Sequence, residues 1–141
     1  MSEIKTFRDL IAWQVGMDTV VLTYELTKEF PVEERYGLIS QMRRCATSIP
    51  SNVAEGQGVR APKWTLRHVN TAIGSSCELD TQLEIAIRLR LVTRERSKVL
   101  AQSIDRVQKL LYGMRREKQR QIGAVVASAG VLFFACERLF S

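Results

Sequence analysis

The stretch that decides the fold runs from Tyr36 to Gly58 and reads YGLISQMRRCATSIPSNVAEGQG. Its apolar residues recur at steps of three and four, which predicts one buried face of an α-helix. They are Leu38, Met42, Cys45, Ile49 and Val53. Arg44 points away from this face, and Arg43 lies at its edge. The stretch therefore predicts an amphipathic helix with a basic side chain on its solvent side.

Pro50 stands inside this predicted helix. A proline there removes one backbone hydrogen bond and crowds the carbonyl of Ala46. Because the apolar spacing persists beyond Pro50, we expect the helix to continue with a kink. We expect the short side chains of Ser48, Ser51 and Asn52 to bond to the freed backbone groups.

Three further segments have helical periodicity, and no segment alternates as a strand would. The first begins at a cap on Thr6 or Asp9 and ends near Lys28. The second begins at Pro62 and ends near Leu91, and the last follows a cap on Thr93. Their predicted inner faces are Leu10, Trp13, Met17, Val20, Val21 and Tyr24; Leu66, Val69, Ile73, Ser76, Leu79 or Asp80, Leu83 and Ile87; and Leu100, Ile104, Val107, Leu111 and Met114.

Four amphipathic helices with short connections predict an all-α, antiparallel up-down-up-down four-helix bundle over residues 1–117. Residues 118–141 form a basic and then apolar C-terminal tail. Glu33 and Glu34 are expected in the first turn of the second helix. Gly56 and Gly58 are expected to end that helix in a left-handed cap. Gly74, with Ser75 and Ser76, is expected to allow close helix packing.

The sequence contains no arrangement of residues typical of an active site. His68 is the only histidine and has no second ligand at metal-binding spacing, so we expect no enzymatic activity, no metal and no cofactor. Cys45, Cys77 and Cys136 show no disulfide spacing, and the N-terminus shows no secretion leader. Cys45 and Cys77 fall on or beside apolar faces and are expected in the core. These features predict a cytoplasmic protein.

Positive charge is concentrated in the last third of the chain. Residues 88–141 hold 12 Lys and Arg against 4 Asp and Glu, whereas residues 1–87 hold 9 against 11. In the fourth predicted helix, one solvent-facing stripe opposite the apolar seam is mostly basic. We call it the basic stripe; its residues are Lys98, Gln102, Arg106, Lys109, Gly113, Arg116 and Arg120. Such a stripe suits a polyanion, although a solvated helix face is the alternative.

A second group of basic residues lies at the start of the third helix. This helix-three cluster consists of Arg60, Lys63 and Arg67, within two turns of a helix N-terminus. Together with Arg44 and the basic stripe, it forms the candidate nucleic-acid-binding surface. Only Tyr112 lies near the stripe among aromatic residues, which argues against base stacking on helix four.

The tail between Ile122 and Cys136 has Ser128 as its single polar side chain. Fifteen residues are too few to span a bilayer, which takes about 20. Three interpretations remain: a fifth helix buried in an oligomer, a membrane-surface anchor behind a basic flank, and a non-native extension. We favour the first and expect no membrane partner.

Several motifs resemble a known family. They are residues 34–38, ERYGL; residues 41–44, QMRR; residues 48–56, SIPSNVAEG; the opening FRDL at 7–10 with Trp13; and AIGS at 72–75 followed by Glu78, Leu79, Thr81, Gln82 and Leu83. In this order they resemble the four-helix-bundle proteins encoded in intervening sequences of bacterial 23S rRNA genes. That family is similar in fold to the accessory variability proteins of diversity-generating retroelements, which assist a reverse transcriptase. The resemblance implies a four-helix bundle that forms homopentamers.

The leading functional hypothesis is a non-catalytic, oligomeric nucleic-acid-binding protein. Its ligand would be structured RNA or an RNA–DNA hybrid, bound through phosphates. The alternative is a protein-interaction scaffold, such as an accessory subunit of a retroelement reverse transcriptase. Apolar residues outside one seam of helix one, such as Ile11, Val15 and Leu22, further favour self-association.

Overall fold

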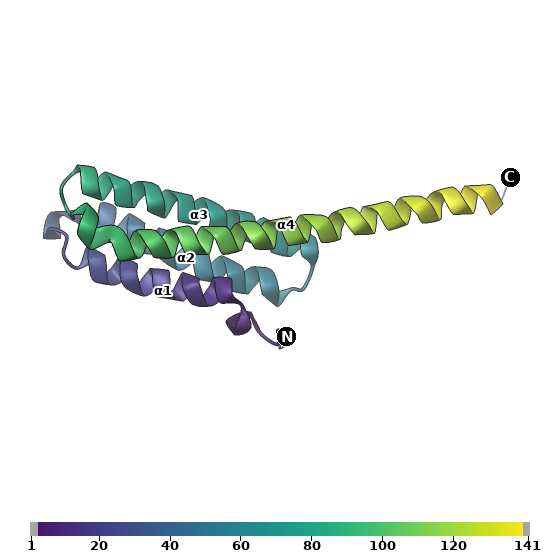
Figure 1. Ribbon diagram of the computed structural model, residues 1–141, viewed down its shortest axis with the longest axis horizontal. Coiled ribbons are helices and arrows are strands. Elements are labelled where there is room, and N and C mark those ends of the chain that lie inside the picture. The colour runs from purple at the N-terminus through teal and green to yellow at the C-terminus, as the bar shows by residue number, and fades with distance from the viewer. Residues whose placement is uncertain (1–2, 140–141) are drawn as a thin grey trace.

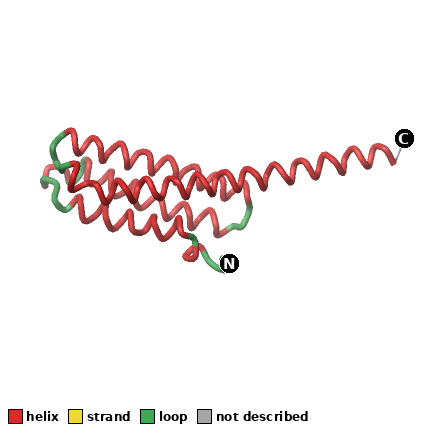
Figure 2. The backbone as a smooth tube through the Cα atoms, viewed as in Figure 1, coloured by secondary structure: helices red, strands yellow, loops and turns green. Residues whose placement is uncertain are grey.

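The computed structural model describes the backbone of residues 3–139 and the side chains of residues 3–130. Four helices lie side by side, and the described residues contain no strand (Figures 1 and 2). The helices are α1 (Ile11–Thr27), α2 (Leu38–Gly58), α3 (Pro62–Arg88) and α4 (Arg94–Leu139). Short 3-10 helices, Phe7–Asp9 and Val32–Glu34, precede α1 and α2.

Each helix packs on two neighbours around one core. α1 lies against α2 and α4, and α3 also lies against α2 and α4, whereas the backbones of the diagonal pairs are farther apart in the described part of the chain. Consecutive helices run in opposite directions, so the chain goes up, down, up and down. The predicted all-α four-helix bundle is confirmed.

α2 continues through Pro50, as predicted, and the kink expected there stays a prediction. Met42, Ile49 and Val53 of its apolar face are fully buried. The polar side chains near the proline bond to neighbouring carbonyls: Ser51 Oγ to Thr47 O at 2.8 Å, and Asn52 Nδ2 to Ser48 O at 2.9 Å. Neither of these two accepting carbonyls is that of Ala46, which is the one that Pro50 leaves without its helical donor.

The predicted inner face of α1 is wrong in part. Met17, Val21 and Tyr24 are exposed, and Leu10, Trp13 and Val20 are only half-buried. The buried face is Ala12, Val15, Gly16, Thr19, Thr23, Leu26 and Thr27. Threonines suit it because their hydroxyls donate to carbonyls four residues earlier, as Thr23 does to Thr19 O at 2.7 Å. Small side chains also allow close approach: a Cβ on Gly16 would lie 3.3 Å from Pro50 Cβ.

The inner faces of α3 and α4 follow the prediction more closely. Val69, Ile73, Ser76, Leu79 and Leu83 are buried in α3, whereas Leu66 and Ile87 are half-buried and Asp80 is exposed. In α4, Leu100, Ile104, Val107 and Leu111 are buried, and Met114 is half-buried. Heptad spacing in α4 therefore identified a real seam.

Several helix-end predictions need correction. Thr6 and Asp9 form a capping box on the 3-10 helix Phe7–Asp9, not on α1. Glu33 and Glu34 lie in the other 3-10 helix, although Glu34 Oε2 accepts a bond from Leu38 N at 3.2 Å. Thr93 Oγ1 caps α4 as predicted, accepting from Arg96 N at 3.1 Å.

The left-handed residue after α2 is Arg60, with φ of 53°, and no described glycine has positive φ. The chain thus reverses two residues beyond Gly58. Gly74 faces open space, so the predicted close packing there is wrong; Gly56 takes that role, because a Cβ on it would lie 3.0 Å from His68 Cβ. Cys45 is buried as predicted, but Cys77 is exposed, and the side chain of Cys136 lies outside the described ones.

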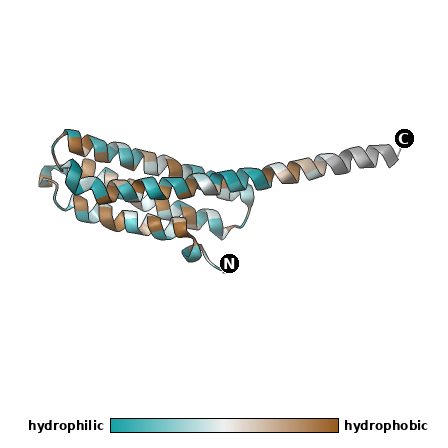
Figure 3. Ribbon diagram, in the orientation of Figure 1, coloured by the Kyte–Doolittle hydropathy of each residue, from teal (hydrophilic) through white to brown (hydrophobic). Residues whose placement is uncertain are grey.

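α4 extends far past the other helices (Figure 1). Its 46 residues span about 69 Å at 1.5 Å per residue. The tail from residue 118 is therefore a continuation of α4 and not a separate fifth helix. Hydrophilic residues cover α4 where it leaves the bundle, and hydrophobic ones follow (Figure 3). Residues 123–129 are exposed in the single chain.

Candidate nucleic-acid interface

The basic stripe faces solvent along α4. Its five basic side chains are all exposed, because the seam residues occupy the opposite side of the helix. From Lys98 to Arg120 the stripe rises through about 33 Å at 1.5 Å per residue. The helix therefore presents an extended row of cations, as the spacing predicts.

Two of the five cations are held by acidic neighbours on the same helix. Lys109 Nζ lies 2.6 Å from Asp105 Oδ2, and Arg120 Nη2 lies 2.8 Å from Glu117 Oε1. Hydrogen bonds from Arg120 and then Gln121 lower the pKa of Glu117 to about 2, so this carboxylate is ionised at neutral pH. Lys98, Arg106 and Arg116 have no acidic partner within salt-bridge distance among the described side chains.

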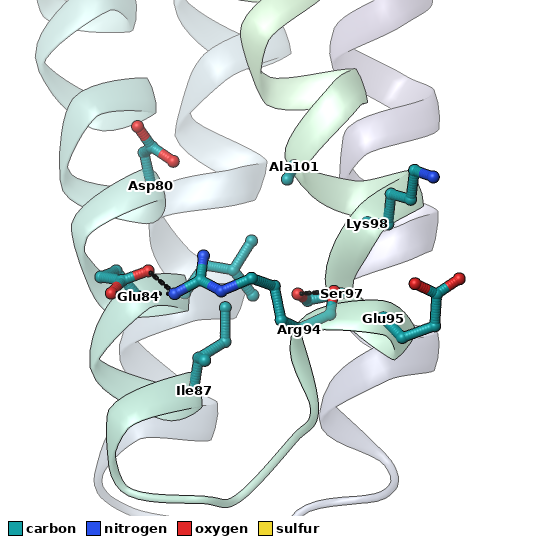
Figure 4. Close-up of a pocket in the computed structure, with 9 residues that line it drawn as sticks. Asp80, Glu84, Ile87, Arg94, Glu95, Ser97, Lys98 and Ala101 are labelled. Carbon is teal, nitrogen blue, oxygen red and sulfur yellow. Dashed lines mark hydrogen bonds and ion pairs between the residues drawn. The ribbon is translucent and has the colours of Figure 1, made fainter.

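The end of the stripe near Lys98 has mixed charge. A groove of about 390 Å³ between α3 and α4 is lined there by Asp80, Glu84, Arg94, Glu95 and Lys98, among others (Figure 4). Glu84 accepts from Arg88 Nε at 2.9 Å and from Arg94 Nη2 at 3.1 Å, and these bonds lower its pKa. Lys98 points away from this ion pair. Lys98 is therefore unpaired but lies in a surface of mixed charge, whereas the unpaired Arg106 and Arg116 lie farther along α4, outside that groove.

The helix-three cluster lies at that same end of the bundle. Arg60 occupies the loop between α2 and α3, and Lys63 and Arg67 are exposed on the first turns of α3. The antiparallel order places this loop beside the point where α4 leaves the bundle (Figure 1). Arg60 and Lys118 line one groove of about 260 Å³, together with Ile4, Gln57, Pro62, Thr65 and Gln121.

Lys118 is a candidate that the sequence analysis missed. At 100° per residue it falls on the same side of α4 as the seam residues Leu100 and Leu111, not on the basic stripe. Beyond the end of the core this side of α4 meets the α2–α3 loop, which accounts for its position beside Arg60.

Arg115, Arg116, Lys118 and Arg120 thus surround α4 with positive charge, and we call them the basic collar. The run of charges was visible in the sequence. Whether these charges lie close to Arg60 depends on where along α4 the bundle ends. The structure therefore brings Arg60 of the helix-three cluster and Lys118 of the basic collar together at one end of the molecule.

Arg44 is the one predicted site residue that stands apart. It is exposed on α2, as predicted, but lies 14 residues before Gly58, or about 21 Å along the helix. It does not line the groove that holds Arg60 and Lys118. The structure therefore does not bring Arg44 together with the other candidates.

Other reactive side chains are engaged in packing. His68 Nδ1 lies 2.9 Å from Asn52 Oδ1 and 3.4 Å from Glu55 Oε2. Ser75 Oγ bonds to Ser48 Oγ at 2.8 Å. Burial raises the pKa of Cys45 to about 11, so its thiol stays protonated. Within the described residues, no cluster of three or more His, Cys, Asp or Glu is placed to hold a metal ion.

A search for membrane-spanning segments among the described residues found no helix with the length and apolar character needed to cross a bilayer.

Comparisons with known proteins agree with this architecture. A crystal structure of a protein of unknown function from the S23 ribosomal protein family of Bacteroides thetaiotaomicron superposes with a TM-score of 0.70 at 22% identity, covering 75% of this chain and 96% of that one. At this identity the likeness shows the fold alone. No curated protein matches the chain. Residues 8–113 match the family described as 23S rRNA-intervening sequence protein. Since this match covers most of the chain, including all of α1 to α3 and the bundled part of α4, the protein belongs to the 23S rRNA-intervening sequence protein family.

Proposed function

We propose that this protein is a non-catalytic, oligomeric nucleic-acid-binding protein that binds structured RNA or RNA–DNA hybrid through phosphates. The observation that carries the proposal is the groove at the α2–α3 end of the bundle, where Arg60 of the helix-three cluster and Lys118 of the basic collar lie on one lining. A phosphate backbone carries closely spaced negative charges, and binding releases its counterions. Clustered Lys and Arg on one face are the electrostatic signature of such a ligand.

The surface favours recognition of shape and charge over sequence. Phosphate contacts position a protein on nucleic acid but carry no sequence information. The unpaired cations of the stripe, Lys98, Arg106 and Arg116, lie on one continuous helix that can follow one strand or groove edge. We therefore expect affinity to depend strongly on salt and weakly on sequence.

Self-association, with five subunits as the expected number, is part of the proposal. The face of α1 that the bundle leaves uncovered is apolar: Met17, Val21 and Tyr24 are 40%, 55% and 39% exposed. These residues follow one another at steps of four and three, so they share one side of the helix. A second copy of the chain would remove this face from water, and a ring would repeat the basic surface on every subunit, adding weak contacts through multivalency.

The proposal is tested with a charge-matched pair of variants. The stripe variant changes Lys98, Arg106, Lys109 and Arg116 to Gln. The control changes four exposed basic residues at or beside the α1–α2 and α3–α4 connections, Lys28, Arg35, Arg88 and Arg90, to Gln. Both lose four charges, so a gel-shift titration with structured RNA and with hybrid separates location from net charge. We expect the stripe variant alone to lose about tenfold or more in affinity, with unchanged circular dichroism.

Other outcomes have distinct meanings. Equal affinity of the stripe variant and wild type would move the site to Arg60, Lys63 and Arg67. Absence of binding by all three proteins would contradict the proposal and favour the protein-interaction scaffold, whose partner is a polypeptide such as a reverse transcriptase.

A further inference from the structure

We propose that Trp64 stacks against an unpaired nucleobase, so that the α2–α3 end of the bundle binds a single-stranded segment of nucleic acid. The inference rests on the proposed function and adds the class of nucleotide bound at the helix-three cluster. It requires a partly exposed, oriented aromatic ring and cations close to it, and the structure supplies both.

The indole of Trp64 is oriented by the end of α2. Its Nε1 donates to Glu55 O at 3.3 Å, one of the last carbonyls of α2. The next residue, Thr65, donates its hydroxyl to Gly56 O at 2.7 Å. Helix α3 thus caps the carbonyl end of α2 with two neighbouring side chains. The ring is therefore fixed by a structural bond at one edge before any ligand binds.

Trp64 keeps part of its surface in contact with solvent. Trp64 is 39% exposed although it is anchored. The imidazole of His68 lies 4.7 Å away between centroids but is tilted by 55°, so the two rings are not parallel-stacked. The guanidinium of Arg67 lies 5.9 Å from the indole centroid. A partly exposed indole with an arginine over its ring resembles the aromatic-and-arginine platforms on which bases stack.

The surrounding charge selects an anionic strand as the occupant. Trp64 lies between Lys63 and Arg67 in the helix-three cluster, and Arg60 lies four residues before it. Arg60 also lines the groove with Lys118, so phosphates on either side of a stacked base would meet cations from α3 and α4. A purely apolar peptide would leave these charges without partners.

Other exposed aromatics lack this setting. Among the described side chains, the exposed aromatic residues besides Trp64 are Tyr24 and Tyr36. Tyr24 belongs to the apolar face of α1, and the guanidinium of Arg43 lies over its ring, 4.5 Å from the centroid. Tyr36 lies in the α1–α2 connection, at the end of the bundle opposite Trp64. Trp64 is the one that stands inside the candidate interface.

A duplex cannot offer an unpaired base without melting. Loss of the Trp64 ring should therefore affect the binding of a duplex and of a single strand differently. Three probes of equal length separate base stacking from phosphate contacts. They are an oligouridylate of about eight nucleotides, an abasic sugar-phosphate oligomer, and an RNA duplex. Wild type is expected to bind oligouridylate about five- to 100-fold more tightly than the abasic oligomer. Trp64→Leu should abolish this preference and change duplex affinity by less than about twofold.

Conservative and spatial controls complete the test. Trp64→Phe keeps a stackable ring but loses the bond to Glu55 O, so it should retain most of the preference. Tyr36→Leu removes an aromatic at the far end and should change nothing. In a Trp13→Phe background, where Trp64 is the only tryptophan, oligouridylate should quench fluorescence and the abasic oligomer should not.

Retention of the oligouridylate preference by Trp64→Leu would overturn the stacking inference and leave the proposed function intact. Equal weakening of all three probes by Trp64→Leu would also overturn it, since a structural defect would affect every ligand. Failure of wild type to bind any probe would overturn both proposals.

Discussion

Asp105 and Glu117 reduce the unpaired positive charge of the basic stripe. Asp105 pairs with Lys109 and Glu117 pairs with Arg120, each about one turn farther along α4. Both pairs are well exposed. Exposed pairs of this kind contribute little to stability, typically under about 1 kcal/mol. Their larger consequence is electrostatic, because each carboxylate cancels one positive charge on the surface that faces the ligand.

Removing these carboxylates should therefore improve binding. In Asp105→Asn with Glu117→Gln, the freed Lys109 and Arg120 can contact phosphates, so we expect affinity for structured RNA to rise roughly two- to tenfold at low salt. Melting temperature should change little. The same substitution at a distant exposed acid, Glu33→Gln, provides the control. Unchanged affinity in the double variant would show that the stripe does not contact the ligand.

The Glu117 carboxylate should titrate well below an ordinary glutamate. Arg120 and Gln121 lower its pKa from 4.5 to about 2 in the folded helix. The sign follows from linkage: the stabilising contribution is present above pH 4.5 and is lost as pH falls toward 2. An NMR carboxyl titration should give a midpoint near 2 in wild type and a midpoint shifted toward 4.5 in Arg120→Gln. Identical midpoints in the two proteins would refute the pairing.

Spacing alone predicts which residues of α4 are exposed and which are buried, because 100° per residue separates Leu100 and Ile104 from Lys98 and Arg106. The pairing of Asp105 with Lys109 is also visible in their four-residue separation. The position of Lys118 could not be predicted this way. It lies on the seam side of the helix, and that side lines a groove with Arg60 only because the core ends before Lys118.

At the scale of the helix, α1 shows why apolar periodicity can select the wrong face. Leu10, Met17 and Val21 form a real apolar stripe, but it is largely uncovered. The buried face carries Thr19, Thr23 and Thr27, whose hydroxyls are satisfied by helix carbonyls. A polar residue that bonds to its own helix can enter a core, and hydropathy does not record this.

A double-mutant cycle tests the polar contact between α1 and α4. Thr19 Oγ1 and Ser103 Oγ lie 2.8 Å apart and are buried. Thr19→Val should lower the free energy of unfolding by about 1 kcal/mol or more, because Ser103 keeps a buried hydroxyl without its partner. Adding Ser103→Ala should recover most of this loss. Additive losses in urea denaturation would contradict a coupled pair.

At the scale of the whole molecule, α4 serves two purposes. Its first half closes the core through Leu100, Ile104, Val107 and Leu111, and the rest leaves the bundle. Val125 and Val126 are 67% and 64% exposed in the single chain. An apolar helix surrounded by water is unfavourable, so this extension suits burial between subunits. The sequence predicted the bundle and the apolar tail, but not that the tail continues α4.

Deleting residues 121–141 should leave the bundle folded, because the seam of α4 ends at Met114. Thermal unfolding should remain cooperative at a nearly unchanged temperature. Light scattering should show weaker assembly than for the full chain, since the deletion removes the proposed subunit contact. Intact assembly with loss of liposome binding would identify a membrane anchor instead, and loss of the fold would contradict both interpretations.

The most direct test of the central claim is the salt dependence of binding by the wild-type protein. Affinity is measured by fluorescence anisotropy across a series of salt concentrations. Two structured RNAs of equal length and structure but unrelated sequence are compared. Phosphate-driven binding through several cations predicts a slope of log affinity against log salt of about −3 or steeper, with less than about tenfold difference between sequences. A slope near zero, or affinity that depends on sequence more than on salt, would contradict the account.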